Sequence, residues 1–85
     1  MTARVEVKGR DVVREAYRIE TEDGRAYVPE CLMTHALRPG ARPSHQDAYE
    51  WIAAHRSALV HAVNRLACGA TPRPPYDIMT LIEAR

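Results

Sequence analysis

The stretch that decides the fold is residues 44–67, which read SHQDAYEWIAAHRSALVHAVNRLA. At about 100° per residue, its apolar side chains fall on one side of a helix and its polar side chains on the other. The apolar side holds Ala48, Ile52, His55, Leu59, Ala62, Val63 and Leu66. The sequence therefore predicts one amphipathic helix over Ser44–Ala67, roughly 24 residues and ~36 Å long. Its apolar stripe has to be covered, because leaving it in water costs free energy.

The segments before this helix alternate in polarity, which is typical of β-strands. Residues 12–20 form one such run, and residues 25–32 form a second. Between them, Thr21-Glu22-Asp23-Gly24 is a turn sequence, because Asp tolerates turn conformations and Gly supplies a positive φ. These patterns predict a β-hairpin over about residues 12–32.

Two registers of this hairpin are open. A two-residue loop pairs Ile19 with Ala26 and Tyr17 with Val28, which keeps apolar side chains on one face. A three-residue loop shifts the pairing by one residue and mixes the faces. We prefer the two-residue loop because it buries more apolar surface. Pro29 has no N–H to donate, which predicts an edge or a bulge there.

Three further segments complete the predicted architecture. Residues 4–8 alternate in polarity and form a short strand that Gly9-Arg10-Asp11 interrupts. Residues 33–38 form a short turn or helix before the long helix. Residues 76–82 form a closing strand, and its apolar residues on both faces predict a strand that is covered on both faces or lies inside the sheet.

The predicted fold class is α+β. A mainly antiparallel sheet of three or four strands carries the one long helix on one face, in a two-layer sandwich. A length of 85 residues predicts a single small domain over residues 1–85.

Composition favours an ordinary globular protein without a dominant charge. Twelve basic residues face eleven acidic ones, for a formal charge of +1. A dedicated nucleic-acid-binding domain usually has a clear basic excess. The chain shows no apolar run of membrane-spanning length and no signal-peptide pattern, which predicts a cytoplasmic protein without a membrane partner. In a reducing compartment, Cys31 and Cys68 are expected to be free, buried thiols.

No sequence motif points to catalysis, to a metal or to a cofactor. Cys31 and His35 are the one nearby Cys/His pair, but nothing indicates an orienting carboxylate or an oxyanion hole. His55 and His61 lie about 240° apart on the helix, so they cannot bind one ion from that surface. We expect His55 to be a core residue with one hydrogen-bond partner. The prediction is a protein that is not an enzyme and needs no cofactor.

Three arginines and a tyrosine form a candidate binding face. Arg10, Arg14 and Arg18 could project from one face of the sheet, with Tyr27 beside Arg18 in the preferred register. A basic sheet face with an aromatic residue is one way in which proteins hold single-stranded RNA or DNA. The alternative is a solvated face with a cation–π contact.

The order of elements resembles a family of short bacterial proteins, domain-of-unknown-function family 1488. The resemblance covers about residues 12–82 and rests on the hairpin with an acidic-Gly turn, Cys-Leu-Met-Thr at 31–34 and Ala-Leu at 36–37. It continues with Ile52, Arg56 and Leu59 in the helix, Gly69 after it, and Ile-Met-Thr at 78–80. The resemblance implies a compact bacterial α+β fold and no established activity. It also matches Arg56 to a helix arginine of the family, which could clamp the sheet or bind a ligand.

The functional hypothesis is a non-catalytic interaction module, either a homodimer or an accessory to a larger bacterial protein. Its basis is the absence of a chemical motif together with a second sheet face that the one helix leaves uncovered. The alternative is weak binding of RNA or single-stranded DNA through the arginine-bearing face.

Overall fold

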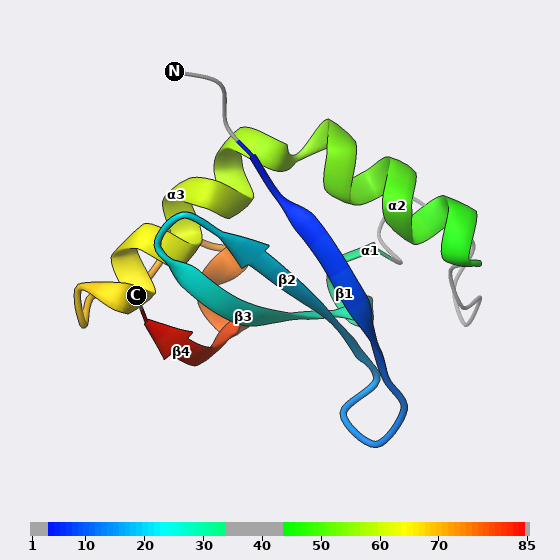
Figure 1. The fold of residues 1–85 in the computed structure, drawn as a ribbon, viewed down its shortest axis with the longest axis horizontal. Helices are drawn as coiled ribbons and strands as arrows, with labels where there is room; N and C mark the ends of the chain where they lie inside the picture. Colours follow the sequence, from blue (N-terminus) through cyan, green and yellow to red (C-terminus); the bar gives the residue numbers. More distant parts are fainter. Residues whose placement is uncertain (1–3, 34–43, 85) are drawn as a thin grey trace.

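A four-stranded antiparallel sheet with helices on one face makes up the computed structural model, which describes residues 4–33 and 44–84 (Figure 1). The strands are β1 (Glu6–Asp11), β2 (Ala16–Thr21), β3 (Gly24–Pro29) and β4 (Thr80–Ala84), in the order β1-β2-β3-β4. The helices are α1 (Glu30–Met33), α2 (His45–Ala54) and α3 (Arg56–Ala67), and a short 3₁₀ turn, η2 (Tyr76–Ile78), precedes β4. The predicted α+β fold is confirmed. Most of the predicted turn at 33–38 lies outside the described residues.

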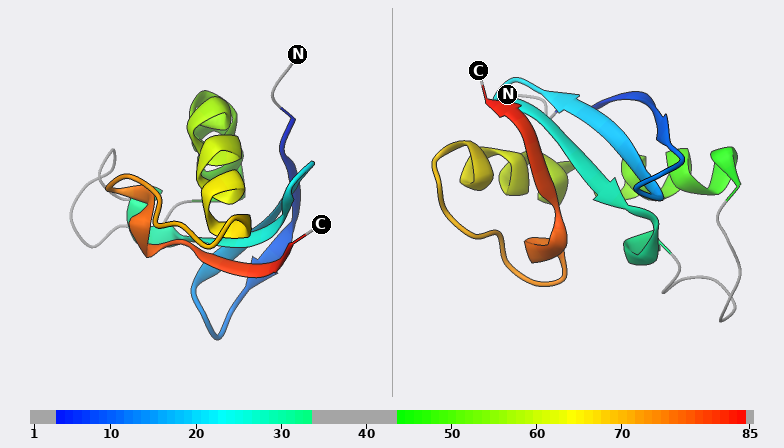
Figure 2. Two further views of the ribbon diagram at one scale, coloured as in Figure 1. Left: turned by 90° about the vertical axis from the view of Figure 1, so that its left-hand side faces the viewer. Right: turned by 90° about the horizontal axis from the view of Figure 1, so that it is seen from below.

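The β2–β3 hairpin has the preferred two-residue register. Ile19 pairs with Ala26 and Tyr17 with Val28, and all four side chains are at most 1% exposed. They form the face of the sheet that the helices cover (Figure 2). Burial of these alternate residues fixes the register, because a shift by one would move all of them to the other face.

The core lies between this face of the sheet and the helices. It comprises Ala16, Tyr17, Ile19, Ala26, Val28, Leu32, Met33, Ala48, Ile52, Leu59, Ala62, Val63 and Met79, each at most 4% exposed. The long helical stripe predicted from the sequence supplies five of these side chains, from Ala48 to Val63. Burial of apolar surface at ~25 cal/mol per Å² stabilises the two layers against each other.

The predicted single helix is divided at His55. Its main chain leaves helical geometry at φ −106° and ψ 18°, so that α2 ends and α3 begins around it. The Trp51 carbonyl oxygen accepts from the main-chain N–H of His55 at 3.0 Å, and it lies 2.8 Å from Nδ1 of the His55 ring. A side chain that bonds the carbonyl four residues back is a recognised cause of a helix break. Figure 1 shows the bend between the two helices, of which α3 packs on β3 and β4.

Ser44 starts the helical segment as predicted. Its hydroxyl oxygen accepts from the Asp47 main-chain N–H at 3.0 Å, and the Asp47 carboxylate accepts from the Ser44 N–H at 3.1 Å. This reciprocal capping box satisfies two N–H groups that a helix start otherwise leaves unpaired.

The bounds of the first two strands differ from the sequence prediction. β1 runs through Gly9-Arg10-Asp11 instead of ending before them, because a β-bulge between Val7 and Gly9 absorbs the irregularity. β2 starts at Ala16, because residues 12–15 form the turn that joins it to β1.

The closing strand was predicted over residues 76–82, either covered on both faces or inside the sheet. Both alternatives are wrong, because β4 is largely exposed and is an outer strand. β4 starts at Thr80 and lies at the sheet edge. It pairs with residues 24–27 of β3, so it does not reach Pro29 at the far end of that strand. The missing N–H of Pro29 therefore removes no hydrogen bond between β3 and β4, although β3 is an inner strand.

Candidate functional site

The four residues of the predicted arginine face are divided between the two faces of the sheet. Arg18 and Tyr27 are cross-strand neighbours on the face away from the helices. Arg14, in the β1–β2 turn, places its guanidinium carbon 4.6 Å from the centre of the Tyr27 ring. These three residues do lie together. The ring that would stack on a base is already in contact with Arg14.

Arg10 lies on the opposite, helix-covered face, which contradicts the predicted common face. It pairs with Tyr17, whose side chain is in the core. The bulge after Val7 is the reason, since one inserted residue exchanges the two faces for everything beyond it. Gly9 at φ 131° provides the backbone conformation that the bulge requires.

The Arg10 guanidinium forms an ion pair with a buried carboxylate of α1. Its Nε lies 2.5 Å from Oε1 of Glu30, and the two side chains are 21% and 8% exposed. The pair ties the end of β1 to α1, the short helix that directly follows β3. A carboxylate this buried needs a cationic partner, because desolvation penalises its charged form.

Replacing Arg10 by glutamine is expected to lower the free energy of unfolding by about 2 kcal/mol. The substitution leaves the Glu30 carboxylate buried without its cation, and partial exposure of Arg10 keeps the cost below that of a fully buried pair. Urea denaturation measures it. The double variant with Glu30→Gln should recover part of the loss, because no buried charge then remains. Equal stability of the single variant and the wild type would contradict the assignment.

A second polar contact lies next to this ion pair. The Tyr17 hydroxyl oxygen is 3.4 Å from Nδ1 of His45, and the His45 and Tyr49 rings meet the Tyr17 ring edge-on. Burial, and then the charge of Glu30, raises the pKa of the Tyr17 phenol, so it stays neutral over the physiological range. The contact orders the start of α2 against β2.

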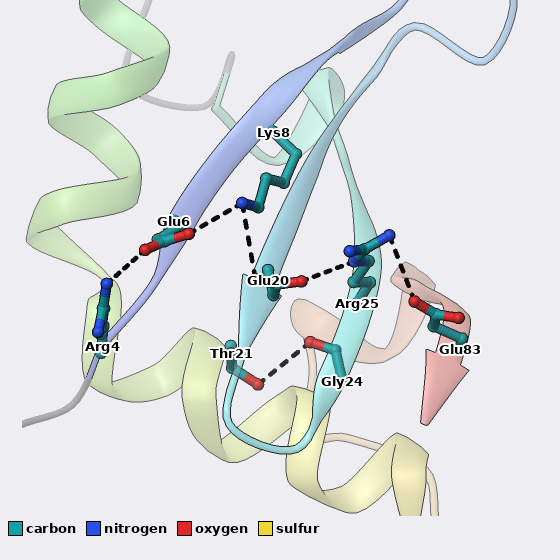
Figure 3. Close-up of polar contacts among 8 residues, drawn as sticks. All are labelled: Arg4, Glu6, Lys8, Glu20, Thr21, Gly24, Arg25 and Glu83. Atoms are coloured by element: carbon teal, nitrogen blue, oxygen red, sulfur yellow. Dashed lines mark hydrogen bonds and ion pairs between the residues drawn. The ribbon is translucent and has the colours of Figure 1, made fainter. Parts of the chain in front are cut away.

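The outer face of the sheet carries a chain of alternating charges (Figure 3). Its ion pairs run, in order, through Arg4, Glu6, Lys8, Glu20, Arg25 and Glu83, at N–O distances from 2.5 to 3.6 Å. Glu6 and Glu20 are directly opposite each other on β1 and β2, and the ammonium of Lys8 lies between them. Hydrogen bonds from Lys8 and Arg4 lower the pKa of Glu6.

Because these charges alternate, they cancel in pairs. A surface that binds a phosphate backbone instead presents an excess of cations. The outer face of the sheet, which was predicted to be uncovered, is therefore largely occupied by ion pairs among its own side chains.

An open apolar groove of about 240 Å³ lies between β1 and the helices. Val5 and Val7 line it from the β1 side, and Tyr49, Ile52, Ala53 and Arg56 line it from the helical side. Tyr49 is half exposed, whereas Ile52 at 3% exposure forms part of the core behind it. We call these six residues the β1 groove.

Arg56 contributes the charge of the β1 groove. It is exposed at the first position of α3, just after the break at His55. Within residues 4–33 and 44–84, its side chain makes neither a salt bridge nor a hydrogen bond. Its two predicted roles were clamping the sheet and binding a ligand, and an exposed guanidinium beside an apolar groove favours the second.

The remaining polar candidates supply no chemical centre in the described segments. Cys31 and Cys68 are not joined in a disulfide within the described residues, and both are exposed, so the prediction that they are buried is wrong. His35, the proposed partner of Cys31, lies outside the described residues. His55 is half-buried and stacks on the Trp51 ring at 4.2 Å between ring centres. In the described parts of the chain, no group of three His, Cys, Asp or Glu side chains could hold a metal ion.

None of the described helices is both long enough and apolar enough to cross a bilayer.

Comparison of the chain with protein-family models, curated proteins and solved structures finds no match. The site is therefore assigned from its own residues.

The β1 groove was not predicted from the sequence, although the residue spacing on each of its two walls is visible there. Tyr49, Ala53 and Arg56 have the spacing of one helix face, and Val5 and Val7 share one face of a strand. The two patterns could be recognised separately. What could not be recognised is that they face each other, because that depends on where β1 lies in the sheet.

Proposed function

We propose that this protein is a non-catalytic interaction module that binds a protein partner through the β1 groove. The observation that carries the proposal is the apolar groove next to the edge strand β1, with the cation Arg56, which no described side chain pairs, at its side. Folding leaves this surface in water, and exposed apolar surface rimmed by polar groups is typical of protein-binding sites. The partner is a second copy of the chain or a larger bacterial protein to which this one is an accessory.

The chemistry of the groove supports binding rather than catalysis. Its ionisable side chains are those of Tyr49 and Arg56. A guanidinium stays protonated in proteins and so neither accepts nor releases a proton during a reaction. The resemblance to family 1488, a family without an established activity, adds no reaction to the proposal.

Weak binding of single-stranded nucleic acid remains the second candidate, supported by Arg14, Arg18 and Tyr27 on the outer face. The alternating ion pairs beside them offer few free cations to phosphates. Titration with a labelled single-stranded oligonucleotide distinguishes the two candidates. Binding to phosphates must weaken steeply as salt is added, whereas an apolar groove responds little.

The interaction itself is tested with two neighbouring substitutions in α2. Ala53→Arg places a long charged side chain in the groove, and Ala54→Arg adds the same side chain at an exposed position that does not line it. The tagged full-length chain is used to capture partners from a lysate of the native cells, and light scattering gives its mass at several concentrations. We expect the wild type and Ala54→Arg to retain a partner or a dimer that Ala53→Arg loses.

Two outcomes would contradict the proposal. One is a wild-type chain that is monomeric at all concentrations and captures nothing. The other is a partner that Ala53→Arg and Ala54→Arg bind equally well, which would place the interaction elsewhere on the surface.

A further inference from the structure

We propose, on the basis of the proposed function, that the β1 groove binds an extended peptide segment of the partner. The segment adds as a strand to the free edge of β1, inserts alternate apolar side chains into the groove, and places a carboxylate against Arg56.

No strand of the described residues pairs with the outer edge of β1, beside the groove. β1 pairs with β2 on one side and forms the end of the sheet on the other. An edge strand presents unpaired N–H and C=O groups, and an extended peptide can take them up as a further strand. The bulge after Val7 and the charge of Lys8 disturb pairing farther along. Strand addition is therefore confined to the stretch that contains Val5 and Val7.

The dimensions of the helical wall fit a short extended segment. Tyr49, Ile52, Ala53 and Arg56 lie within the eight residues 49–56 of α2 and α3, which corresponds to ~10 Å of helix. An extended peptide covers that distance with about three residues, of which two point to the same side. Val5 and Val7 provide the matching pair of apolar positions on the opposite wall.

The positive charge of the groove determines which charged group the bound peptide must carry. Arg56 is unpaired among the described residues, whereas the cations in and just before β1 have partners. Arg4 and Lys8 contact Glu6, and Arg10 contacts Glu30. A guanidinium at the edge of an apolar groove pairs best with a carboxylate, which accepts two parallel hydrogen bonds from it. The carboxylate can come from an Asp or Glu side chain or from the end of a chain.

A second copy of β1 fits the same edge less well. Its alternate residues Val5 and Val7 would enter the groove, and both are apolar. The carboxylate between them, Glu6, would point away from the groove and is already paired with Arg4 and Lys8, so such a dimer would leave Arg56 without a carboxylate. Charge complementarity therefore favours a peptide from a different protein.

The test is selection of peptides on the full-length chain from two libraries of random nonapeptides. One library has free carboxyl termini, and the other has its carboxyl termini fused to the display protein. We expect enriched sequences with apolar residues at alternate positions and one carboxylate. Enrichment in the first library alone assigns the carboxylate to the chain end, and enrichment in both assigns it to a side chain.

Fluorescence anisotropy with the best selected peptide then measures the contribution of each wall. Arg56→Gln should weaken binding about tenfold, and Arg73→Gln, which removes an exposed arginine away from the groove, should not change it. Ala53→Arg should abolish binding while Ala54→Arg preserves it. Slower hydrogen exchange of the β1 amides in the complex reports the added strand.

Three results would overturn the inference. They are the absence of any enriched peptide, selected peptides without a carboxylate or with unchanged affinity for Arg56→Gln, and a wild-type dimer that Ala53→Arg dissociates. The last assigns the groove to a second copy. If peptides fail while Ala53→Arg still removes a captured partner, the interaction module stands and only the peptide inference falls.

Discussion

Replacing Leu59 by alanine is expected to lower the free energy of unfolding by about 3 kcal/mol. The side chain is fully buried in α3, which packs on β3 and β4, so its removal leaves a cavity at the centre of the core. Loss of the buried methyl groups and the cavity both contribute to the cost. In a domain of this size the melting temperature should fall by roughly 15 °C, measurable by circular dichroism.

His61→Ala, at an exposed position of the same helix, is the matched control and should change stability by no more than about 0.5 kcal/mol. Similar melting temperatures for the two variants would contradict the packing of α3 on the sheet. Such a result would also remove the basis for placing the β1 groove, because the same helical layer forms its wall.

Replacing Gly24 by alanine is expected to cost about 3 kcal/mol or more. A Cβ on Gly24 would lie 2.3 Å from the carbonyl oxygen of Glu83 in β4, closer than atoms can approach. Gly24 also has φ 147°, which side-chain-bearing residues rarely adopt. The clash is with main chain, so a side-chain rotation cannot relieve it and β3 and β4 have to separate. Chemical denaturation measures the loss, and faster hydrogen exchange in β4 locates it.

Gly69→Ala separates the two contributions to this effect. Gly69 likewise has a positive φ, of 79°, but a Cβ there meets no atom within 4 Å. It should therefore cost only about 1 kcal/mol, from backbone strain. If the two alanine variants were equally destabilised, the close approach of β4 to Gly24 would be wrong.

The local features of the fold could be predicted from particular residues. The alternation around Tyr17 and Ile19 gave the correct hairpin register, and Ser44 gave the correct helix start. Each depends on side chains within a few positions of one another, and their periodicity shows which face is apolar. The same reasoning identified the buried stripe of the helix, including Ile52 and Leu59.

Predictions failed where distant segments or a local irregularity decided the outcome. Arg10 was assigned to the wrong face because one bulged residue exchanges the faces beyond it. From the sequence, Gly9 is equally compatible with a bulge and with the end of a strand. The helix divides at His55 because its ring lies close to the Trp51 carbonyl oxygen, a contact that periodicity does not reveal. Cys31 and Cys68 were expected to be buried from their residue type alone, and both are exposed.

The binding face predicted from the sequence also combines a local feature that could be predicted with surroundings that could not. Arg14, Arg18 and Tyr27 lie together as their spacing indicated, but their surroundings of paired charges depend on four strands lying side by side.

By itself, the amino-acid sequence determined the α+β class, the β2–β3 pairing and the apolar side of the helical segment. These follow from near-neighbour periodicity, since burial of one face depends on which side chains share it. Only the tertiary structure decided that β1 ends the sheet beside the junction of α2 and α3, and that the Arg56 side chain lies next to Val5 and Val7. A groove between an edge strand and a helix is a property of two segments about 50 residues apart in the chain, and no local pattern specifies their separation in space.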